Sequence, residues 1–126
     1  MDKWAEISDL IGKTLTAITV HDNEEIRFQC ADGTEYQMYH DQGCCEHVSI
    51  DDIDGDIQRL VGQEVIIADE RWSCENPPNG YDAGDSFTWT FYTLRTNLDS
   101  VTIRWFGTSS GYYSEAVDFV QIVGRE

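Results

Sequence analysis

Residues 25–40 read EIRFQCADGTEYQMYH, and this stretch decides the fold of the chain. Before the turn, apolar and polar residues alternate, which is typical of a strand with one buried face. The Asp-Gly pair inside ADGT favours the positive backbone dihedral angles of a tight turn. Alternation resumes over residues 35–40. The stretch therefore predicts a β-hairpin in which three residues of each strand share one face: Ile26, Phe28 and Cys30, then Tyr36, Met38 and His40.

The pattern around this hairpin occurs twice. Residues 3–11 carry apolar residues at helical spacing up to Gly12, a β-branched run follows, and residues 54–61 repeat this order up to Gly62. A second predicted hairpin, FTWTFYTL with VTIRWF, follows in the later half. The predicted fold is α+β and β-rich, with two pseudo-symmetric halves, each a short helix followed by about four mainly antiparallel strands. We expect a single domain, residues 1–126, with an internal duplication of residues 3–50 and 54–122.

The chain is strongly acidic, with 24 Asp and Glu against eight Lys and Arg, a formal net charge of −16. This charge disfavours direct nucleic-acid binding and anionic membranes, and it favours a basic protein partner. Hydrophobic residues make up 40%, which is enough for a folded core. Neither a signal peptide nor a membrane-spanning run is recognisable, so we expect a cytoplasmic protein without a membrane partner.

Two adjacent cysteines stand between two histidines in YHDQGCCEHVSI, residues 39–50. Neighbouring residues in a strand point to opposite faces, and this spacing does not match the paired ligands of structural zinc. We therefore expect no metal and no cofactor. In a reducing compartment the four cysteines are expected as free thiols, and a strained vicinal disulfide is disfavoured. They are Cys30, Cys44, Cys45 and Cys74.

The acidic run DDIDGD, residues 51–56, is a candidate calcium loop, but it lacks the glycine and glutamate positions of an EF-hand. Asp54 or Asp56 is instead predicted to cap the helix that follows. No catalytic motif is present, so we do not expect an enzyme. A Cys45 thiol with His40 or His47, and Glu46 with Glu115, are the only pairings that resemble catalytic groups.

The segment WFGTSSGYYSE, residues 105–115, combines aromatic rings with hydroxyl groups. Such a segment could line a pocket for a ring carrying a phosphate or sugar. The alternative, which we favour, is that the aromatic residues fill a β-core and the small residues form a turn. The ligand-binding residues of the first interpretation are Arg104, Trp105, Ser109, Ser110, Tyr112 and Tyr113.

The run MYHDQGCCEHVSIDDIDGDI, with SFTWTFYTL and VTIRWFGTSSGYYSEAVDF, resembles a family of short bacteriophage and prophage proteins of unknown function. That family carries Y-H-x-Q-x-C-C-E-x-V and G-Y-Y-S-E-x-V-D-F segments, and the resemblance covers residues 10–122. Gly43 and His47 depart from its pattern, where an acidic and a small residue are expected, so no site is built on them. The resemblance implies a viral context and carries over no catalytic residue.

Charge and resemblance together predict a non-enzymatic, phage-type accessory or counter-defence protein in the host cytosol. It would bind and inhibit a basic host protein, such as a nuclease or CRISPR effector, through a nucleic-acid-mimicking surface. The alternatives are a sponge for a nucleotide signal and an immunity protein for a toxin, and a homodimer stays open. The expected acidic face consists of Asp51, Asp52, Asp54, Asp56, Asp69 and Glu70.

Overall fold

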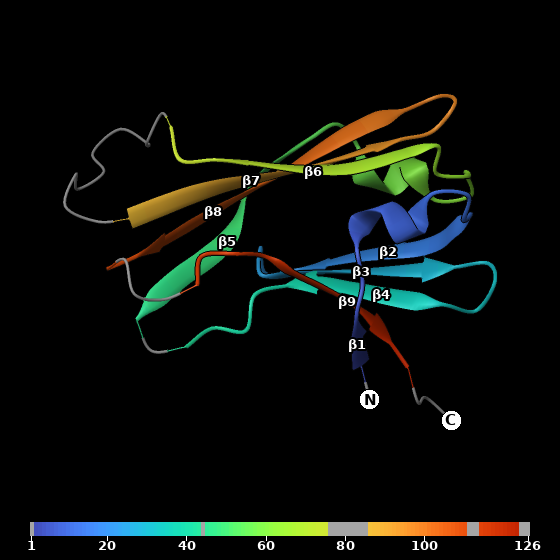
Figure 1. The fold of residues 1–126 in the computed structure, drawn as a ribbon. Helices are drawn as coiled ribbons and strands as arrows, with labels where there is room; N and C mark the ends of the chain where they lie inside the picture. The colour runs from blue at the N-terminus through green and yellow to red at the C-terminus, as the bar shows by residue number, and fades with distance from the viewer. Residues whose placement is uncertain (1, 44, 76–85, 111–113, 124–126) are drawn as a thin grey trace.

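The computed structural model describes residues 2–43, 45–75, 86–110 and 114–123, which form a β-sandwich (Figure 1). Two antiparallel sheets are stacked face to face. The five-stranded sheet has the order β1-β9-β4-β3-β2, and the four-stranded sheet has the order β5-β8-β7-β6. The strands are β1 (Asp2–Trp4), β2 (Leu15–His21), β3 (Glu25–Cys30), β4 (Glu35–Tyr39), β5 (Glu46–Asp54), β6 (Ile67–Ser73), β7 (Ser86–Arg95), β8 (Ser100–Ser109) and β9 (Asp118–Ile122).

The predicted α+β class is wrong, because neither half contains an α-helix among the described residues. The two helical segments are single 3-10 turns, η1 (Ile7–Leu10) and η2 (Ile57–Leu60), and the residue after each turn is extended. A spacing of three residues matches the 3-10 period, so the first and last residue of each turn are buried. Trp4 of the expected helical stripe lies in β1 and is 74% exposed.

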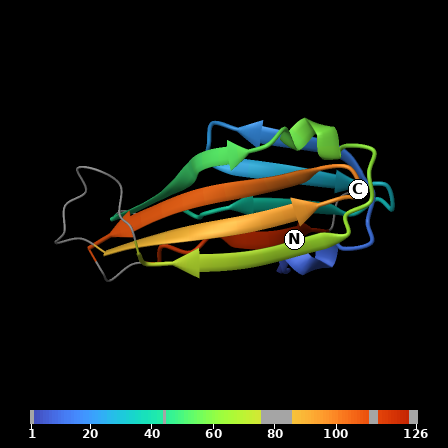
Figure 2. The ribbon, with the colours of Figure 1, turned by 90° about the horizontal axis from the view of Figure 1, so that it is seen from above.

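The two halves exchange their last strands. Strands β2, β3 and β4 are neighbours in one sheet, and β6, β7 and β8 are neighbours in the other. Strand β5 leaves the first meander to pair with β8, whereas β9 leaves the second to pair with β4. Figure 2 shows β5 lying beside β8 at the edge of the upper sheet. From each 3-10 turn onward, the order of the described elements is therefore the same in both halves, whereas β1 precedes the turn of the first half only. A duplication of the sequence stays a prediction.

The halves also meet through reciprocal backbone hydrogen bonds just after the two 3-10 turns. Gly12 and Gly62 have φ angles of +88° and +89°, a conformation that glycine adopts without steric cost. Each bond in one half has a counterpart fifty residues later, as in a two-fold contact. The N–H groups donate from Gly12 to Val65, from Val65 to Lys13, from Gly62 to Leu15 and from Leu15 to Gln63.

The inner faces of both sheets form one core, and the hairpin prediction for residues 25–40 is confirmed. Phe28 and Met38 are fully buried, and His40 is 8% exposed on the same side. The Trp105 indole N–H donates to the Met38 sulfur at 3.3 Å and so joins the sheets across the core. The second predicted hairpin is confirmed as well, as β7 and β8.

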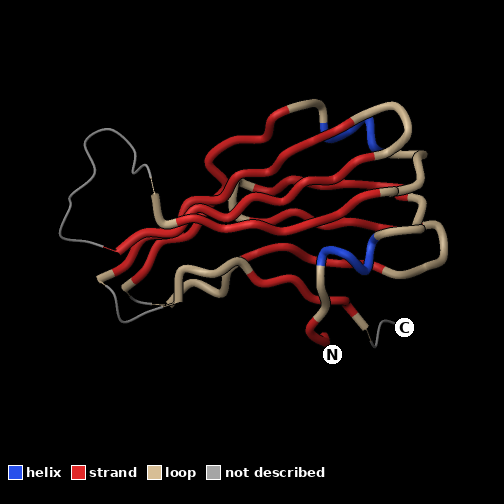
Figure 3. Tube along the Cα trace, turned by 45° about the horizontal axis from the view of Figure 1, so that its top comes forward, coloured by secondary structure: helices blue, strands red, loops and turns tan. Residues whose placement is uncertain are grey.

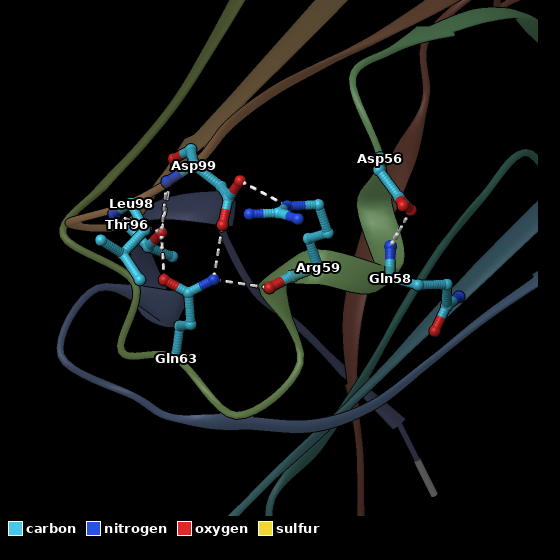
Figure 4. A network of polar contacts seen from close by, with 7 residues as sticks. All are labelled: Asp56, Gln58, Arg59, Gln63, Thr96, Leu98 and Asp99. Carbon is cyan, nitrogen blue, oxygen red and sulfur yellow. Dashed lines mark hydrogen bonds and ion pairs between the residues drawn. The ribbon is translucent and has the colours of Figure 1, made fainter.

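A polar network fixes the β7–β8 hairpin to η2 (Figure 4). The Gln63 amide donates to Asp99 Oδ2 at 2.7 Å and accepts from the Thr96 hydroxyl at 2.7 Å. Arg59 Nε donates to Asp99 Oδ1 at 2.8 Å. Hydrogen bonds from Gln63 and Arg59 lower the pKa of Asp99. This end of the sandwich, where the 3-10 turns lie, is therefore held by side chains as well as by backbone (Figure 3).

The first half holds its own hairpin in a similar way. Lys13, which follows Gly12 as Gln63 follows Gly62, donates through Nζ to the Asp32 carboxylate in the β3–β4 turn. Asp32 also accepts from the backbone and hydroxyl of Thr34. These donors, Lys13 first, lower the pKa of Asp32. No described helix has the length and apolar character needed to cross a membrane.

Candidate functional site

A cleft of about 340 Å³ lies between the inner face of β6 and β7 and the segment that leads into β9. Strand residues two apart share a face, so β6 and β7 each place alternate side chains along it. The lining is polar, with two carboxylates, four hydroxyl groups and one exposed indole. It comprises Glu70, Trp72, Ser86, Thr88, Thr90, Ser114, Glu115, Ala116 and Val117.

Neutral donors hold the two carboxylates of this cleft. Glu115 accepts from the Thr88 hydroxyl at 2.8 Å and from the Ser109 hydroxyl at 2.6 Å. Glu70 accepts from the Tyr92 hydroxyl at 3.1 Å. Burial and the adjacent Glu70 carboxylate raise the pKa of Tyr92, so the phenol stays protonated and remains a donor. Neither carboxylate forms an ion pair with Lys, Arg or His within the described part of the chain.

His40 connects the two segments that the sequence singled out, on the side of the core that borders the cleft. Its Nδ1 lies 2.7 Å from the Ala116 carbonyl, and its Nε2 lies 2.8 Å from Glu46 Oε2. The His40 ring therefore bridges the segment before β9 and the start of β5. The His40 and Glu46 side chains are 4% and 6% exposed. His40 thereby supports the backbone beside Glu115 without entering the cleft.

Glu46 also organises the loop that carries the adjacent cysteines. The Gly43 N–H donates to Glu46 Oε2 at 2.7 Å. The His40 hydrogen bond and this N–H lower the pKa of Glu46 to about 2. Gln42 extends the loop by donating to the Val48 carbonyl.

The expectation of free thiols is wrong for Cys45, which is disulfide-bonded, whereas Cys30 and Cys74 are free. That expectation rested on an assumed reducing compartment, but disulfide formation also depends on local geometry. Cys44 lies outside the described residues. No group of three His, Cys, Asp or Glu residues suited to a metal occurs in the described ranges.

The pairings that resembled catalytic groups are not assembled. His47 is exposed on the edge strand β5, and both ring nitrogens of His40 are already engaged. Glu46 and Glu115 occupy corresponding places in the two halves, but they are held by different donors. One is held by His40 and backbone N–H groups, the other by hydroxyl groups of β7 and β8.

Half-buried aromatic rings lie on the outer face of the four-stranded sheet. The Trp89 and Phe106 ring centroids are 4.6 Å apart. Arg104 lies 5.3 Å from the Trp89 ring, and Arg71 lies 5.5 Å from the Phe91 ring, both over the ring faces. A groove of about 250 Å³ runs here, lined by Ser73, Glu75, Trp89, Phe91 and Arg104.

The four predicted ligand-binding residues that the structure describes do not share one site. Arg104 lies on the outer face of β8, whereas Trp105 is fully buried on the inner face. Ser109 is buried and donates to Glu115, next to the cleft, and Ser110 is exposed just beyond β8. Tyr112 and Tyr113 lie outside the described residues. The favoured interpretation, that aromatic residues fill the core, is confirmed for Trp105.

The six predicted acidic residues divide into two groups. Asp51, Asp52 and Asp54 lie on the edge strand β5, and Asp56 caps η2 by accepting from the Gln58 N–H at 3.1 Å. Asp69 and Glu70 lie on β6 at the opposite edge of the sheet.

The β2–β3 turn adds two exposed carboxylates to the first group, because the Ile50 N–H donates to the Asn23 carbonyl at 2.7 Å. Sequence alone did not bring this turn to β5, since the contact joins residues that are far apart in the chain. We call the resulting set the acidic edge: Asp22, Glu24, Asp51, Asp52, Asp54 and Asp56. All six residues are exposed.

The fold and these surfaces define a class of protein, a small two-sheet β-sandwich with an anionic edge and a polar cleft between its sheets. The chain belongs to the DUF7448 family, a domain of unknown function, whose family model matches residues 8–119. The expected membership of a family of unknown function is thereby confirmed. Comparison with curated proteins and with solved structures finds no match.

Proposed function

We propose that this protein is a non-enzymatic binding protein that docks on a basic host protein through the acidic edge and inhibits it. The acidic edge is the observation that supports the proposal. Among the described residues, only two basic side chains contact its six exposed carboxylates. Arg104 contacts Asp51, and His21 contacts Asp22. Such a surface attracts a cationic groove over a distance set by the ionic strength.

The shape of the edge fits an extended basic groove. Alternate residues of a strand are about 7 Å apart, so Asp52 and Asp54 of β5 lie in a row, with Asp51 beside them at an irregularity of the strand. Acidic residues also keep an edge strand from pairing with another chain. The carboxylates of β5 would therefore both attract a basic groove and protect the edge. The phage setting and the host cytosol come from the resemblance of the two motif segments. A nuclease or a CRISPR effector is the proposed kind of target.

The test compares two variants with the same change in net charge. Asp52→Asn with Asp54→Asn neutralises the edge, and Glu64→Gln with Asp69→Asn neutralises two carboxylates elsewhere. With host lysate at low salt, we expect wild type and the second variant to retain one host protein and the first variant to lose it. The association rate constant with that protein should fall steeply as salt rises, because steering is screened.

Binding that is indifferent to salt, or lost equally in both variants, would contradict the proposal. The same complex, sized by light scattering, also shows whether the partner is held one to one, as an immunity protein would hold a toxin. The sizing of the free protein shows whether it forms a homodimer.

A second candidate function, a sponge for a nucleotide signal, has support from the groove on the outer face. Trp89, Phe91 and Arg104 line it together, and they offer ring stacking and a positive charge to a phosphate. This is not the place that the sequence predicted, because Trp105 is in the core. Thermal stabilisation by a nucleotide panel that Arg104→Gln abolishes would favour this function over the first.

A further inference from the structure

We propose that the cleft between the sheets is a binding site for an organic cation, a guanidinium or ammonium group on an aliphatic stem. The cleft lies on the β6 side of the four-stranded sheet, and the acidic edge lies on the β5 side. The proposal therefore does not depend on the proposed function. It follows from the hydrogen-bonding capacity of the lining, from the unpartnered hydroxyl group of Thr90 that opens into the cleft, and from one exposed indole.

The lining has more hydrogen-bond acceptors than donors. Each carboxylate oxygen can accept about two hydrogen bonds, and the described donors to Glu70 and Glu115 are three hydroxyl groups. The Thr88 hydroxyl donates to Glu115, so only its lone pairs remain for a ligand. A ligand that complements this surface must bring N–H donors and positive charge.

Thr90 provides a second, independent indication of a ligand. The residue is 3% exposed and lines the cleft, and its side chain makes no hydrogen bond with another described residue. No fully buried polar side-chain atom of the described residues lacks a hydrogen-bond partner, so the unpartnered Thr90 hydroxyl opens into the cleft, where a ligand can reach it. A donor group in the cleft would satisfy Thr90 together with the two carboxylates.

Trp72 completes the chemistry of a cation site. Its indole is 71% exposed and lines the same cleft as Glu70, which lies two residues earlier on β6. An aromatic face beside carboxylates favours a desolvated organic cation over a metal ion, because the ring quadrupole attracts the cation and its apolar stem packs on the ring. A cleft of about 340 Å³ is within the range of small-ligand sites.

The cation has two conceivable sources, a free small amine or a basic side chain of a protein, and the test separates them. The probes are n-butylguanidinium, n-butylammonium, neutral n-butylurea and a capped five-residue peptide with a central arginine. Binding is followed by NMR at the Trp72 indole N–H, assigned by its loss in Trp72→Phe, and at the Thr90 amide.

We expect both small cations to give saturable shifts and the urea to give none. Glu70→Gln and Glu115→Gln should each weaken binding at least about tenfold, because each removes a charged acceptor. Asp54→Asn, on the acidic edge, should change affinity less than about twofold, since exposed charges at that distance are screened. Thr90→Val, which keeps the shape of the side chain, should weaken binding without lowering the melting temperature.

A peptide that binds at least about tenfold more tightly than n-butylguanidinium identifies a protein side chain as the source, and equal affinities identify a free amine. The proposal is overturned if no cation gives a saturable shift up to about 10 mM, a ceiling that covers weak millimolar binding. It is also overturned if the urea binds equally, or if the Glu70→Gln, Glu115→Gln double variant binds as wild type does. Each of these outcomes leaves docking through the acidic edge untouched.

Discussion

The Glu46 carboxylate receives hydrogen bonds from the His40 ring and from the backbone N–H groups of Gly43 and Cys45. Gln42 closes the same loop on Val48. Five residues that the Y-H-x-Q-x-C-C-E-x-V pattern specifies therefore take part in the hydrogen bonds of this loop: His40, Gln42, Cys45, Glu46 and Val48. Their role in the described structure is to shape a loop and, through His40, to hold the Ala116 carbonyl beside the cleft.

The lowered pKa of Glu46 predicts a contribution to stability at neutral pH that disappears in acid. The stabilisation is fully present above the ordinary glutamate value of about 4.3. It is lost as pH falls through the folded-state pKa of about 2, because the unfolded chain binds the proton first. Denaturant unfolding of wild type and Glu46→Gln between these values should show a steeper loss in wild type.

Asp32 and Asp99 also have lowered pKa values, so the wild-type profile alone does not isolate Glu46. The difference between the wild-type and Glu46→Gln profiles isolates the contribution of Glu46. Glu64→Gln, at an exposed position on another part of the surface, is the matched control and should follow wild type. Parallel profiles for wild type and Glu46→Gln would show that the buried pair adds no acid-dependent stability.

Among the elements, the two 3-10 turns show what local sequence specified and what it did not. The apolar spacing predicted a stripe of Trp4, Ile7 and Ile11 with Leu10 beside it, but only Ile7 and Leu10 are buried. In the second turn, Ile57 and Leu60 are buried as expected. The spacing did not distinguish a four-residue turn from a longer helix, because a single turn offers too few residues to separate periods of 3.0 and 3.6. The glycine at the end of each turn was the more reliable signal.

Gly12→Ala and Gly62→Ala should destabilise the protein by similar amounts. Both positions have positive φ, and no atom lies within 4 Å of an added Cβ, so only backbone strain is introduced. That strain costs about 1–2 kcal/mol for a residue with a Cβ. Chemical denaturation at neutral pH measures the free energy of unfolding of each variant.

Equal decreases in the free energy of unfolding would show that the two glycine positions of the reciprocal contact contribute equally to stability. A difference larger than about 1 kcal/mol between Gly12→Ala and Gly62→Ala would contradict this, since their surroundings would then be energetically distinct despite equal φ angles.

Strand β7 shows a second limit of local reasoning. Phe87, Trp89 and Phe91 share a face as predicted, but this is the outer face, and Thr90, Tyr92 and Leu94 face the core. A strand with apolar residues in both registers does not reveal which side is inner.

The sequence did not predict the cleft for a related reason. Its carboxylates, Glu70 and Glu115, come from segments that only long-range pairing brings together.

At the scale of the whole molecule, the net charge of −16 acts against the compact state. Local ion pairs such as Arg59 with Asp99 offset only part of the repulsion, because carboxylates outnumber basic residues three to one. We expect the melting temperature to rise by several degrees between about 20 mM and about 500 mM NaCl, as screening weakens the repulsion.

Calorimetry in NaCl and in KCl measures this effect, and similar rises in both salts show that it does not depend on one cation. Sulfate salts are avoided, because they strengthen apolar burial as well. A melting temperature that falls with salt would mean that the ion pairs outweigh the net repulsion.

The hairpins were predictable because each is encoded by neighbouring residues and a turn. The exchange of β5 and β9 was not, since it depends on pairings between strands that are far apart in sequence. The division of the predicted acidic face has the same origin. Asp52 and Asp69 are on opposite edges of one sheet, which only the strand order reveals.

This exchange of final strands means that each meander is completed by the other half of the chain. Cutting the chain between the halves would leave a first fragment without β9, which lies between β1 and β4, and a second fragment without the edge strand β5. Each fragment would also carry a strand whose pairing partner is in the other fragment. Neither half therefore has a complete set of strand pairings on its own. The single chain thus has the strand exchange that a domain-swapped dimer has between two chains. We expect the two halves to fold and unfold together.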